Sequence, residues 1–153
     1  MSSKVSTVFV LTEKNNNKVR GYYTLSSLAI KFDELPVKVQ KKLPRYPSIG
    51  ATLLGRLGVD ESYRDELTRQ GRSPRLGELL LVDAQYNCLK GSLTVASAVM
   101  LIDVEEPSAA EIAAGARDPL GFYLQYGFIA LPMTPRTVFK RVSTIEKELS
   151  RTT

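Results

Sequence analysis

Two stretches decide the fold: residues 49–59 read IGATLLGRLGV, and residues 75–84 read RLGELLLVDA. The first is nearly all apolar apart from Arg56, which is typical of a central strand that is covered on both faces. The second begins a run of apolar residues at helical spacing, so a helix is predicted over residues 75–90, with Gly91 at its end. A central strand, a polar segment and a helix therefore follow one another.

A β-hairpin is predicted before the central strand. Residues 5–12 and 20–27 are rich in β-branched and aromatic residues, and a polar turn at residues 13–18 joins them. A basic segment interrupted by three prolines comes next and is predicted to be a loop. Residues 60–74 are polar and contain helix-breaking residues, which predicts a second loop before the helix.

The rest of the chain is predicted to alternate between strands and helices. Strands are predicted at residues 93–103, 128–132 and 137–142. Helices are predicted to begin at the capping box of residues 108–111, at Asp118-Pro119 and at the capping box of residues 143–146. This order indicates one α/β domain over residues 1–153, with a mixed sheet of about six strands flanked by helices.

Composition narrows the range of functions. The 153 residues contain no apolar run long enough for a membrane helix and no apolar block near Met1, so a cytoplasmic protein is expected. Cys88 is the only cysteine and histidine is absent, so neither a disulfide, a zinc site nor a histidine base is expected. The net charge of +5 suits a polyanionic partner such as RNA or a phosphorylated cofactor, and equally a soluble basic surface.

Three segments, taken together and in this order, resemble the toxin branch of the GNAT N-acetyltransferases. They are GYYTLS at residues 21–26, LGRLGVD at residues 54–60 followed by the 75–84 stretch, and FYLQYGF at residues 122–128 followed by Leu131-Pro132. The matched framework spans most of residues 7–145. The resemblance implies the GNAT fold, with a mostly antiparallel sheet splayed at its centre. It also implies acetyl-coenzyme A as co-substrate and a primary amine as acceptor.

The resemblance places the coenzyme A diphosphate at the start of the helix, in a glycine-containing loop of the family. Backbone N–H groups at a helix start can hold a diphosphate. The matching positions, with the helix residues that follow, are Arg72, Ser73, Pro74, Arg75, Leu76, Gly77 and Glu78. Arg75 stands where the family has a middle glycine, and Pro74 removes one N–H donor. Side chains of Arg72 and Arg75 could compensate by pairing with phosphate; alternatively, Pro74 only starts the helix and both arginines are solvated.

The resemblance assigns two further roles. The backbone of Leu57, Gly58 and Val59 would pair with the pantetheine arm, and an N–H there would polarise the thioester carbonyl. Tyr123 would be the general acid that protonates the departing thiolate, because a phenol with a pKa near 10 is protonated at neutral pH. The alternatives are that residues 57–59 are simply core strand and that Tyr123 is a core aromatic. Asp60 and Glu61 are weaker candidates for contact with the amine.

The acceptor and partners are expectations from the nearest branch. They are the amino group of aminoacyl-tRNA, a ribbon-helix-helix antitoxin and a homodimer formed by pairing of exposed strands. A basic set would guide the RNA backbone: Lys38, Lys41, Lys42, Arg45 and Arg136. The family usually has a strand and two helices before the hairpin, which this chain does not show. A catalytically weak or inactive module that binds RNA or a protein is therefore the main alternative, and acetylation of a metabolite or protein amine is another.

Overall fold

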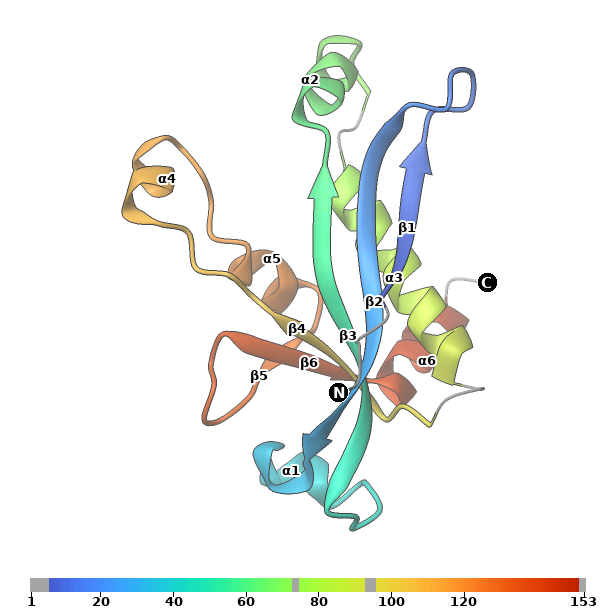
Figure 1. Ribbon diagram of the computed structural model, residues 1–153, viewed down its shortest axis with the longest axis vertical. Helices are drawn as coiled ribbons and strands as arrows, with labels where there is room; N and C mark the ends of the chain where they lie inside the picture. The colour runs from blue at the N-terminus through green and yellow to red at the C-terminus, as the bar shows by residue number, and fades with distance from the viewer. Residues whose placement is uncertain (1–5, 73–74, 93–95, 152–153) are drawn as a thin grey trace.

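A six-stranded sheet forms the centre of the molecule. The computed structural model describes residues 6–72, 75–92 and 96–151. The strands are β1 (Thr7–Thr12), β2 (Val19–Lys31), β3 (Ser48–Val59), β4 (Val99–Asp103), β5 (Ile129–Ala130) and β6 (Thr137–Arg141). They lie in the order β1-β2-β3-β4-β6-β5, and only the β3–β4 pair is parallel. The predicted mixed, mostly antiparallel sheet is confirmed (Figure 1).

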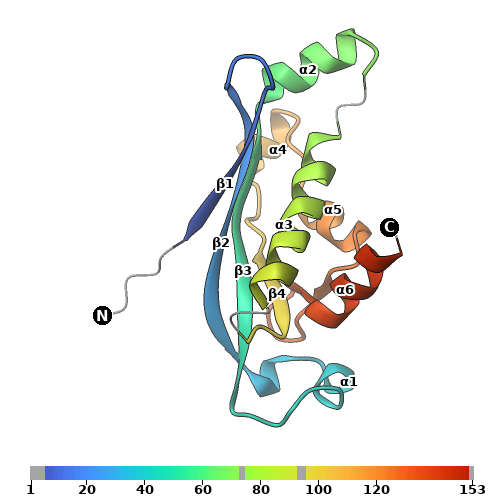
Figure 2. The same ribbon diagram turned by 90° about the vertical axis from the view of Figure 1, so that its right-hand side faces the viewer.

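Helices cover the sheet unevenly. The helical elements are η1 (Phe32–Glu34), α1 (Val37–Gln40), α2 (Glu61–Arg69), α3 (Leu76–Ser92), α4 (Ala109–Ala113), α5 (Leu120–Gln125) and α6 (Val142–Ser150). The long helix α3 and the C-terminal α6 lie together on one face of the sheet, as Figure 2 shows. The larger core cluster lies beneath them, and a second cluster on the other side includes Ile30, Leu35 and Phe139.

The parallel strands β3 and β4 separate part of the way along. They pair only between residues 51–54 of β3 and 99–102 of β4, whereas β3 continues to Val59 (Figure 1). The edge of β3 that faces β4 therefore has no strand partner beyond Leu54 in the described sheet. The splay predicted for the sheet centre is confirmed.

A β-bulge in β3 lies where the two strands separate. Leu25 of β2 pairs with Leu54 and Tyr23 pairs with Leu57, so Thr24 alone stands opposite two residues, Gly55 and Arg56. Arg56 N–H donates to Thr24 Oγ1 at 3.0 Å instead of to the ladder. A β-carbon at position 55 would lie 2.7 Å from the same oxygen, so a larger residue there would have to displace the Thr24 hydroxyl. Bulges bend the strand that carries them, which turns β3 away from β4.

Two segments predicted as loops contain helices. Residues 61–69 form α2, because the Asp60 carboxylate accepts hydrogen bonds from the N–H groups of Ser62 and Tyr63 and caps the helix. Only Leu67 of α2 is buried, so the apolar period that marks a helix is nearly absent. The basic segment before β3 likewise holds the short elements η1 and α1 rather than a loop throughout.

Two predicted boundaries also differ. β4 begins at Val99 rather than at residue 93; residues 93–95 lie outside the described residues. The last helix begins at Val142 with Arg141 at its N-cap and no side-chain cap, so the capping box predicted at residues 143–146 is wrong. The capping box predicted at residues 108–111 is confirmed. None of the described helices has the length and apolar character needed to cross a membrane.

Candidate active site

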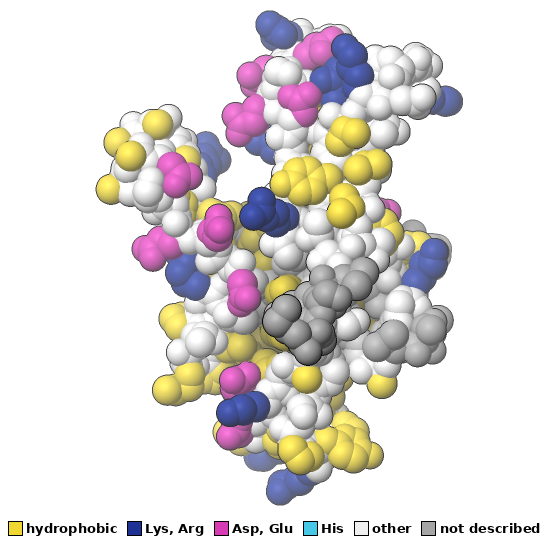
Figure 3. All heavy atoms as spheres, in the orientation of Figure 1, with side chains coloured by type: hydrophobic (Ala, Val, Ile, Leu, Met, Phe, Trp, Pro, Cys, Tyr) yellow, Lys and Arg dark blue, Asp and Glu magenta, His cyan; other side chains and the backbone are white. Residues whose placement is uncertain are grey.

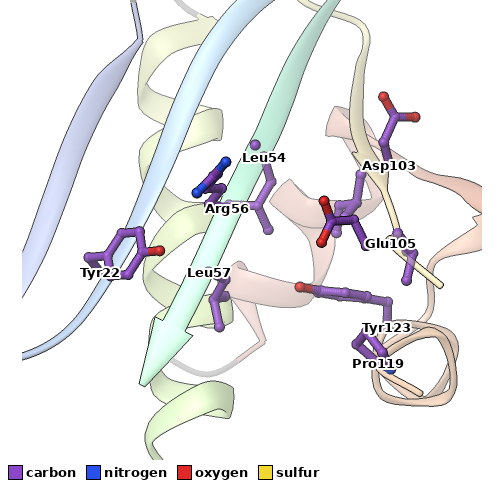
Figure 4. A pocket seen from close by; sticks show the side chains of 11 residues that line it. Tyr22, Leu54, Arg56, Leu57, Asp103, Glu105, Pro119 and Tyr123 are labelled. Carbon is purple, nitrogen blue, oxygen red and sulfur yellow. The ribbon is translucent and has the colours of Figure 1, made fainter. Parts of the chain in front are cut away.

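A cavity of about 510 Å³ opens where β3 and β4 part, and we call it the strand cavity. It draws its walls from β2, β3, β4 with the segment after it, and α5 (Figure 4). The lining residues are Tyr22, Leu54, Gly55, Arg56, Leu57, Ile102, Asp103, Val104, Glu105, Pro119 and Tyr123. The bulge in β3 creates this space, because paired strands would leave no gap between them.

Tyr123 of α5 has its hydroxyl in the strand cavity (Figure 4). The residue is only 8% exposed, and its ring packs edge-on against Phe122 and Phe128. Within the described residues the hydroxyl has no hydrogen-bond partner. Burial raises the pKa of Tyr123 above the ordinary value, so the phenol keeps its proton at neutral pH and is free to donate it to a ligand.

The end of β3 offers backbone along one edge of the gap. Leu57 lines the strand cavity, whereas Gly58 and Val59 lie beyond its lining and pair with Tyr22 and Gly21 of β2. The ring of Tyr22 covers Gly58 so closely that a β-carbon there would lie 2.6 Å from Tyr22 Cε1. The opposite edge of these three residues carries no strand among the described ones. An extended ligand arm could therefore pair with it as an added strand.

A second hollow, of about 490 Å³, lies at the start of α3, and we call it the helix hollow. Its lining comes from α2, α3 and α5: Arg64, Arg75, Gly77, Glu78, Phe122, Gln125 and Tyr126. The first N–H groups of the 17-residue α3 have no intrahelical acceptors. With the helix dipole, they make this end attractive to anions.

Two arginines face the helix hollow. Arg75 is 79% exposed and lies 3.8 Å from Glu78, a contact weak enough to yield to a phosphate. Arg64 comes from α2, and its Nε is buried without a hydrogen-bond partner in the described part of the chain. The sequence interpretation missed Arg64 because it placed residues 60–74 in a loop. A capped helix there would have indicated that the side chain is held toward α3.

Arg72 and Leu76, which were also predicted to bind the diphosphate, do not place their side chains in the helix hollow. Arg72 lines a different hollow, with Arg20, Tyr63 and Leu67. Leu76 is buried, so only its backbone is available at the helix start. Ser73 and Pro74 lie outside the described residues. The structure thus brings Arg75, Gly77 and Glu78 together but separates the Arg72 side chain from them.

The short helix α5 touches both hollows. Phe122 lines the helix hollow and Tyr123 the strand cavity, and a β-carbon at Gly77 would lie 3.6 Å from the Phe122 ring. The start of α5 is fixed by Asp118, which accepts a hydrogen bond from the Leu120 N–H at 3.0 Å. The two hollows therefore share one wall.

Arg136 ties α5 to the end of β4. Its guanidinium pairs with Asp118 at 2.8 Å and donates to the carbonyl oxygens of Val104 and Glu105. This arginine and the Leu120 N–H lower the pKa of Asp118 to about 2. Most of the Arg136 donors are thus engaged within the protein, so a role in guiding an RNA backbone stays a prediction that these contacts do not support.

The remaining charged candidates lie away from the strand cavity. Asp60 caps α2 and pairs with Arg20 at 2.7 Å, and Ser62 and Arg20 lower its pKa to about 2. Neither Asp60 nor Glu61 lines the strand cavity, so contact with an acceptor amine is not supported. The basic residues 38–45 lie around α1, at the end of the sheet opposite α2 (Figure 1).

Two carboxylates of the strand cavity were not predicted. Asp103 ends β4 and Glu105 follows two residues later, and both line the cavity; Figure 4 shows the Glu105 carboxylate pointing into the gap. Figure 3 shows acidic side chains over the β4 side of this face. Alternating charges directly after a buried strand would have been the available signal in the sequence.

Comparison with known proteins agrees with this arrangement. No family model matches the chain. In sequence, the chain is similar to the probable toxin TacT of Sinorhizobium fredii (strain NBRC 101917 / NGR234). The two are 29% identical over 143 residues, which cover 90% of this chain and 70% of TacT.

Solved structures show the same fold. AtaT complexed with acetyl-methionyl-tRNAfMet matches with a TM-score of 0.68 at 28% identity, covering 93% of this chain and 74% of AtaT. AtaT has also been solved with acetyl-CoA and with the C-terminus of the antitoxin AtaR. A tyrosine-to-phenylalanine variant of KacT matches with a TM-score of 0.70 at 23% identity, covering 92% of this chain and 74% of KacT. The chain therefore has the GNAT fold and is related to the toxin-type members of that superfamily.

Proposed function

We propose that this protein is an N-acetyltransferase that moves the acetyl group of acetyl-coenzyme A to the amino group of an aminoacyl-tRNA. The observation that carries the proposal is the Tyr123 hydroxyl, which bonds to none of the described residues and lies in the cavity where β3 and β4 separate. A buried phenol with no acceptor of its own can supply a proton to a leaving group. The similarity to AtaT, which has been solved with acetyl-methionyl-tRNAfMet and, with its antitoxin, with acetyl-CoA, supports the reaction class.

The residues present fit acetyl-coenzyme A. Arg64 and Arg75, with the first N–H groups of α3, would bind the diphosphate in the helix hollow. The free edge of β3 at residues 57–59 would hold the pantetheine arm and polarise the thioester carbonyl. The thioester supplies an activated acetyl group. A new C–N bond forms to the amine, the C–S bond breaks, and Tyr123 would give its proton to the departing sulfur. The proton that the attacking amine loses passes to solvent, and solvent returns one to the Tyr123 phenolate, so the phenol is restored.

The choice of acceptor rests on the relatives and on charge. AtaT was solved with acetyl-methionyl-tRNAfMet, the product that such a transfer would give. The net charge of +5 suits a polyanionic substrate. Charged tRNA is a cytoplasmic substrate, so we expect the protein to act in the cytoplasm. We further propose that a ribbon-helix-helix antitoxin binds this chain and that the chain forms a homodimer, which co-expression and sedimentation would test.

The direct test uses charged tRNA and labelled acetyl-coenzyme A. We expect label to enter aminoacyl-tRNA and not the same tRNA after deacylation. Calorimetric titration of acetyl-coenzyme A into the folded protein should show binding. Binding without transfer to any amine would favour the inactive-module alternative, and neither binding nor transfer would remove the enzyme assignment.

A further inference from the structure

The β4 side of the strand cavity carries negative charge that none of the described residues neutralises by an ion pair. The Glu105 carboxylate forms no hydrogen bond or ion pair with the described residues, and in Figure 4 it points into the gap beside Tyr123. Asp103 accepts one hydrogen bond, from Thr137 Oγ1 at 2.8 Å, and makes no ion pair within the same residues. Unpaired carboxylates at a cavity wall attract a cationic group and repel an anionic one.

The hydroxyl of Tyr123 is an independent sign that a ligand occupies this space. Tyr123 is 8% exposed, and its unpartnered hydroxyl is directed into the same cavity. The hydroxyl opens onto the cavity and bonds to none of the described residues, so it is available to a bound molecule. A ligand that reaches Tyr123 must therefore pass close to Glu105.

The opposite wall has the other sign of charge. Arg56, on the β3 bulge, is the one cationic residue that lines the strand cavity as far as the structure describes it. Paired strands lie about 4.8 Å apart, and β3 and β4 diverge beyond Leu54 and Ile102. The two walls are therefore separated by more than one strand spacing.

From this charge arrangement we propose that Glu105 and Asp103 select acceptor amines that have no carboxylate beside them. The inference rests on the proposed transferase function and names its acceptor class: amino acids held as esters or amides, as opposed to free amino acids. A free amino acid holds its ammonium and carboxylate only about 3 Å apart. A free amino acid therefore cannot place its ammonium at the acidic wall and its carboxylate at Arg56. When its amine approaches Glu105, its carboxylate must also come close to Glu105, which repels it. An ester linked to a nucleotide has lost that carboxylate, and its phosphates lie far enough from the amine to face Arg56.

The expected discrimination against free amino acids depends on how exposed the acidic side chains are. Glu105 is exposed, so its interactions are screened as in water. Two like charges about 5 Å apart in a water-like medium change an equilibrium by about fourfold, and a second carboxylate raises the discrimination to about tenfold. Selection against free amino acids should therefore be moderate and sensitive to salt.

The test compares kcat/KM for methionine and for methionine methyl ester, with acetyl-coenzyme A as donor. The ester also has the less basic amine, so the ester-to-acid ratio of the native protein does not by itself test the inference. The test is the change in that ratio when Glu105 is substituted. We expect Glu105→Gln to lower the ester-to-acid ratio about fourfold, because attraction of the amine is lost for both substrates whereas repulsion of the carboxylate is lost for the free acid alone; high salt should lower the ratio in the native protein. Glu106→Gln is the matched control, because Glu106 is exposed and lies outside the cavity lining.

Folding and donor binding are checked separately. Glu105→Gln should keep the melting temperature and the calorimetric affinity for acetyl-coenzyme A. An unchanged ester-to-acid ratio in that variant, while the native protein acetylates the ester, would overturn the inference and leave the transferase function standing. Failure of the native protein to acetylate either the ester or aminoacyl-tRNA would instead overturn the proposed function, and the inference with it.

Discussion

Removal of the Tyr123 hydroxyl should slow transfer without disturbing the fold. Tyr123→Phe keeps the ring, and with it the edge-on packing against Phe122 and Phe128. Since the hydroxyl bonds to none of the described residues, its loss should change the free energy of unfolding by less than about 0.5 kcal/mol. A general acid contributes about 10²–10⁴-fold to the rate, which corresponds to about 3–5 kcal/mol of activation free energy.

The assay is single-turnover transfer from labelled acetyl-coenzyme A to aminoacyl-tRNA, with calorimetry and thermal melting alongside. Tyr123→Phe should lower the rate at least about 100-fold while acetyl-coenzyme A affinity and melting temperature stay at the native values. Tyr86→Phe is the matched control, because Tyr86 is half exposed on α3 and lines neither hollow. It should transfer at the native rate.

The pH dependence gives a second check with a defined sign. Burial raises the pKa of Tyr123, and the acid form is lost only as pH rises through that raised pKa. The native rate should therefore not fall through loss of this acid below about pH 10, the ordinary tyrosine pKa. A Tyr123→Phe rate within threefold of native, or an equal loss in Tyr86→Phe, would refute the general-acid role.

Three further predictions concern other parts of the molecule. Arg64→Gln should weaken acetyl-coenzyme A binding about 10-fold by calorimetry and leave the melting temperature unchanged, since the guanidinium would otherwise pair with phosphate. Asp118→Asn should lower stability at neutral pH. Because the folded pKa of about 2 lies below the ordinary 3.8, the difference from native should disappear as pH falls from about 4 to 2 in denaturant titrations. Gly50→Ala should cost about 1–3 kcal/mol in chemical denaturation, because the added carbon would lie 2.0 Å from the Ala96 carbonyl oxygen; native-like stability would show that the backbone there moves freely.

The sheet could be predicted from the sequence because its strands bury apolar residues in simple patterns. The order of β1, β2 and β3 follows from alternation and turn residues, and α3 from helical spacing. The splay is harder to see. It depends on Thr24, which lies on a neighbouring strand, and only the pairing register shows that Thr24 faces both Gly55 and Arg56. The splay was therefore predicted from the resemblance to the GNAT family, because the strand register is not visible in the sequence.

The candidate site was only partly visible for a related reason. Tyr123 was singled out through the resemblance, since periodicity alone would equally suit a core aromatic. Arg64 was missed because α2 is held by the Asp60 cap and by Arg20, which stacks on Tyr63 at 4.6 Å, rather than by an apolar face. Polar contacts of this kind leave no periodic trace in a sequence. Glu105 was passed over because its meaning depends on the cavity beside it.

The position of α5 between the two hollows should couple binding of the donor to binding of the acceptor. Phe122 packs over Gly77 at the helix hollow, and the next residue, Tyr123, reaches the strand cavity. Both depend on a helix of six residues, too short to be stable by itself. Its start is held by Asp118 and Arg136, and Arg136 also binds the carbonyl of Glu105. A ligand that presses on Phe122 would therefore shift Tyr123 and the acidic wall with it, so diphosphate binding and acceptor choice should not be independent of each other.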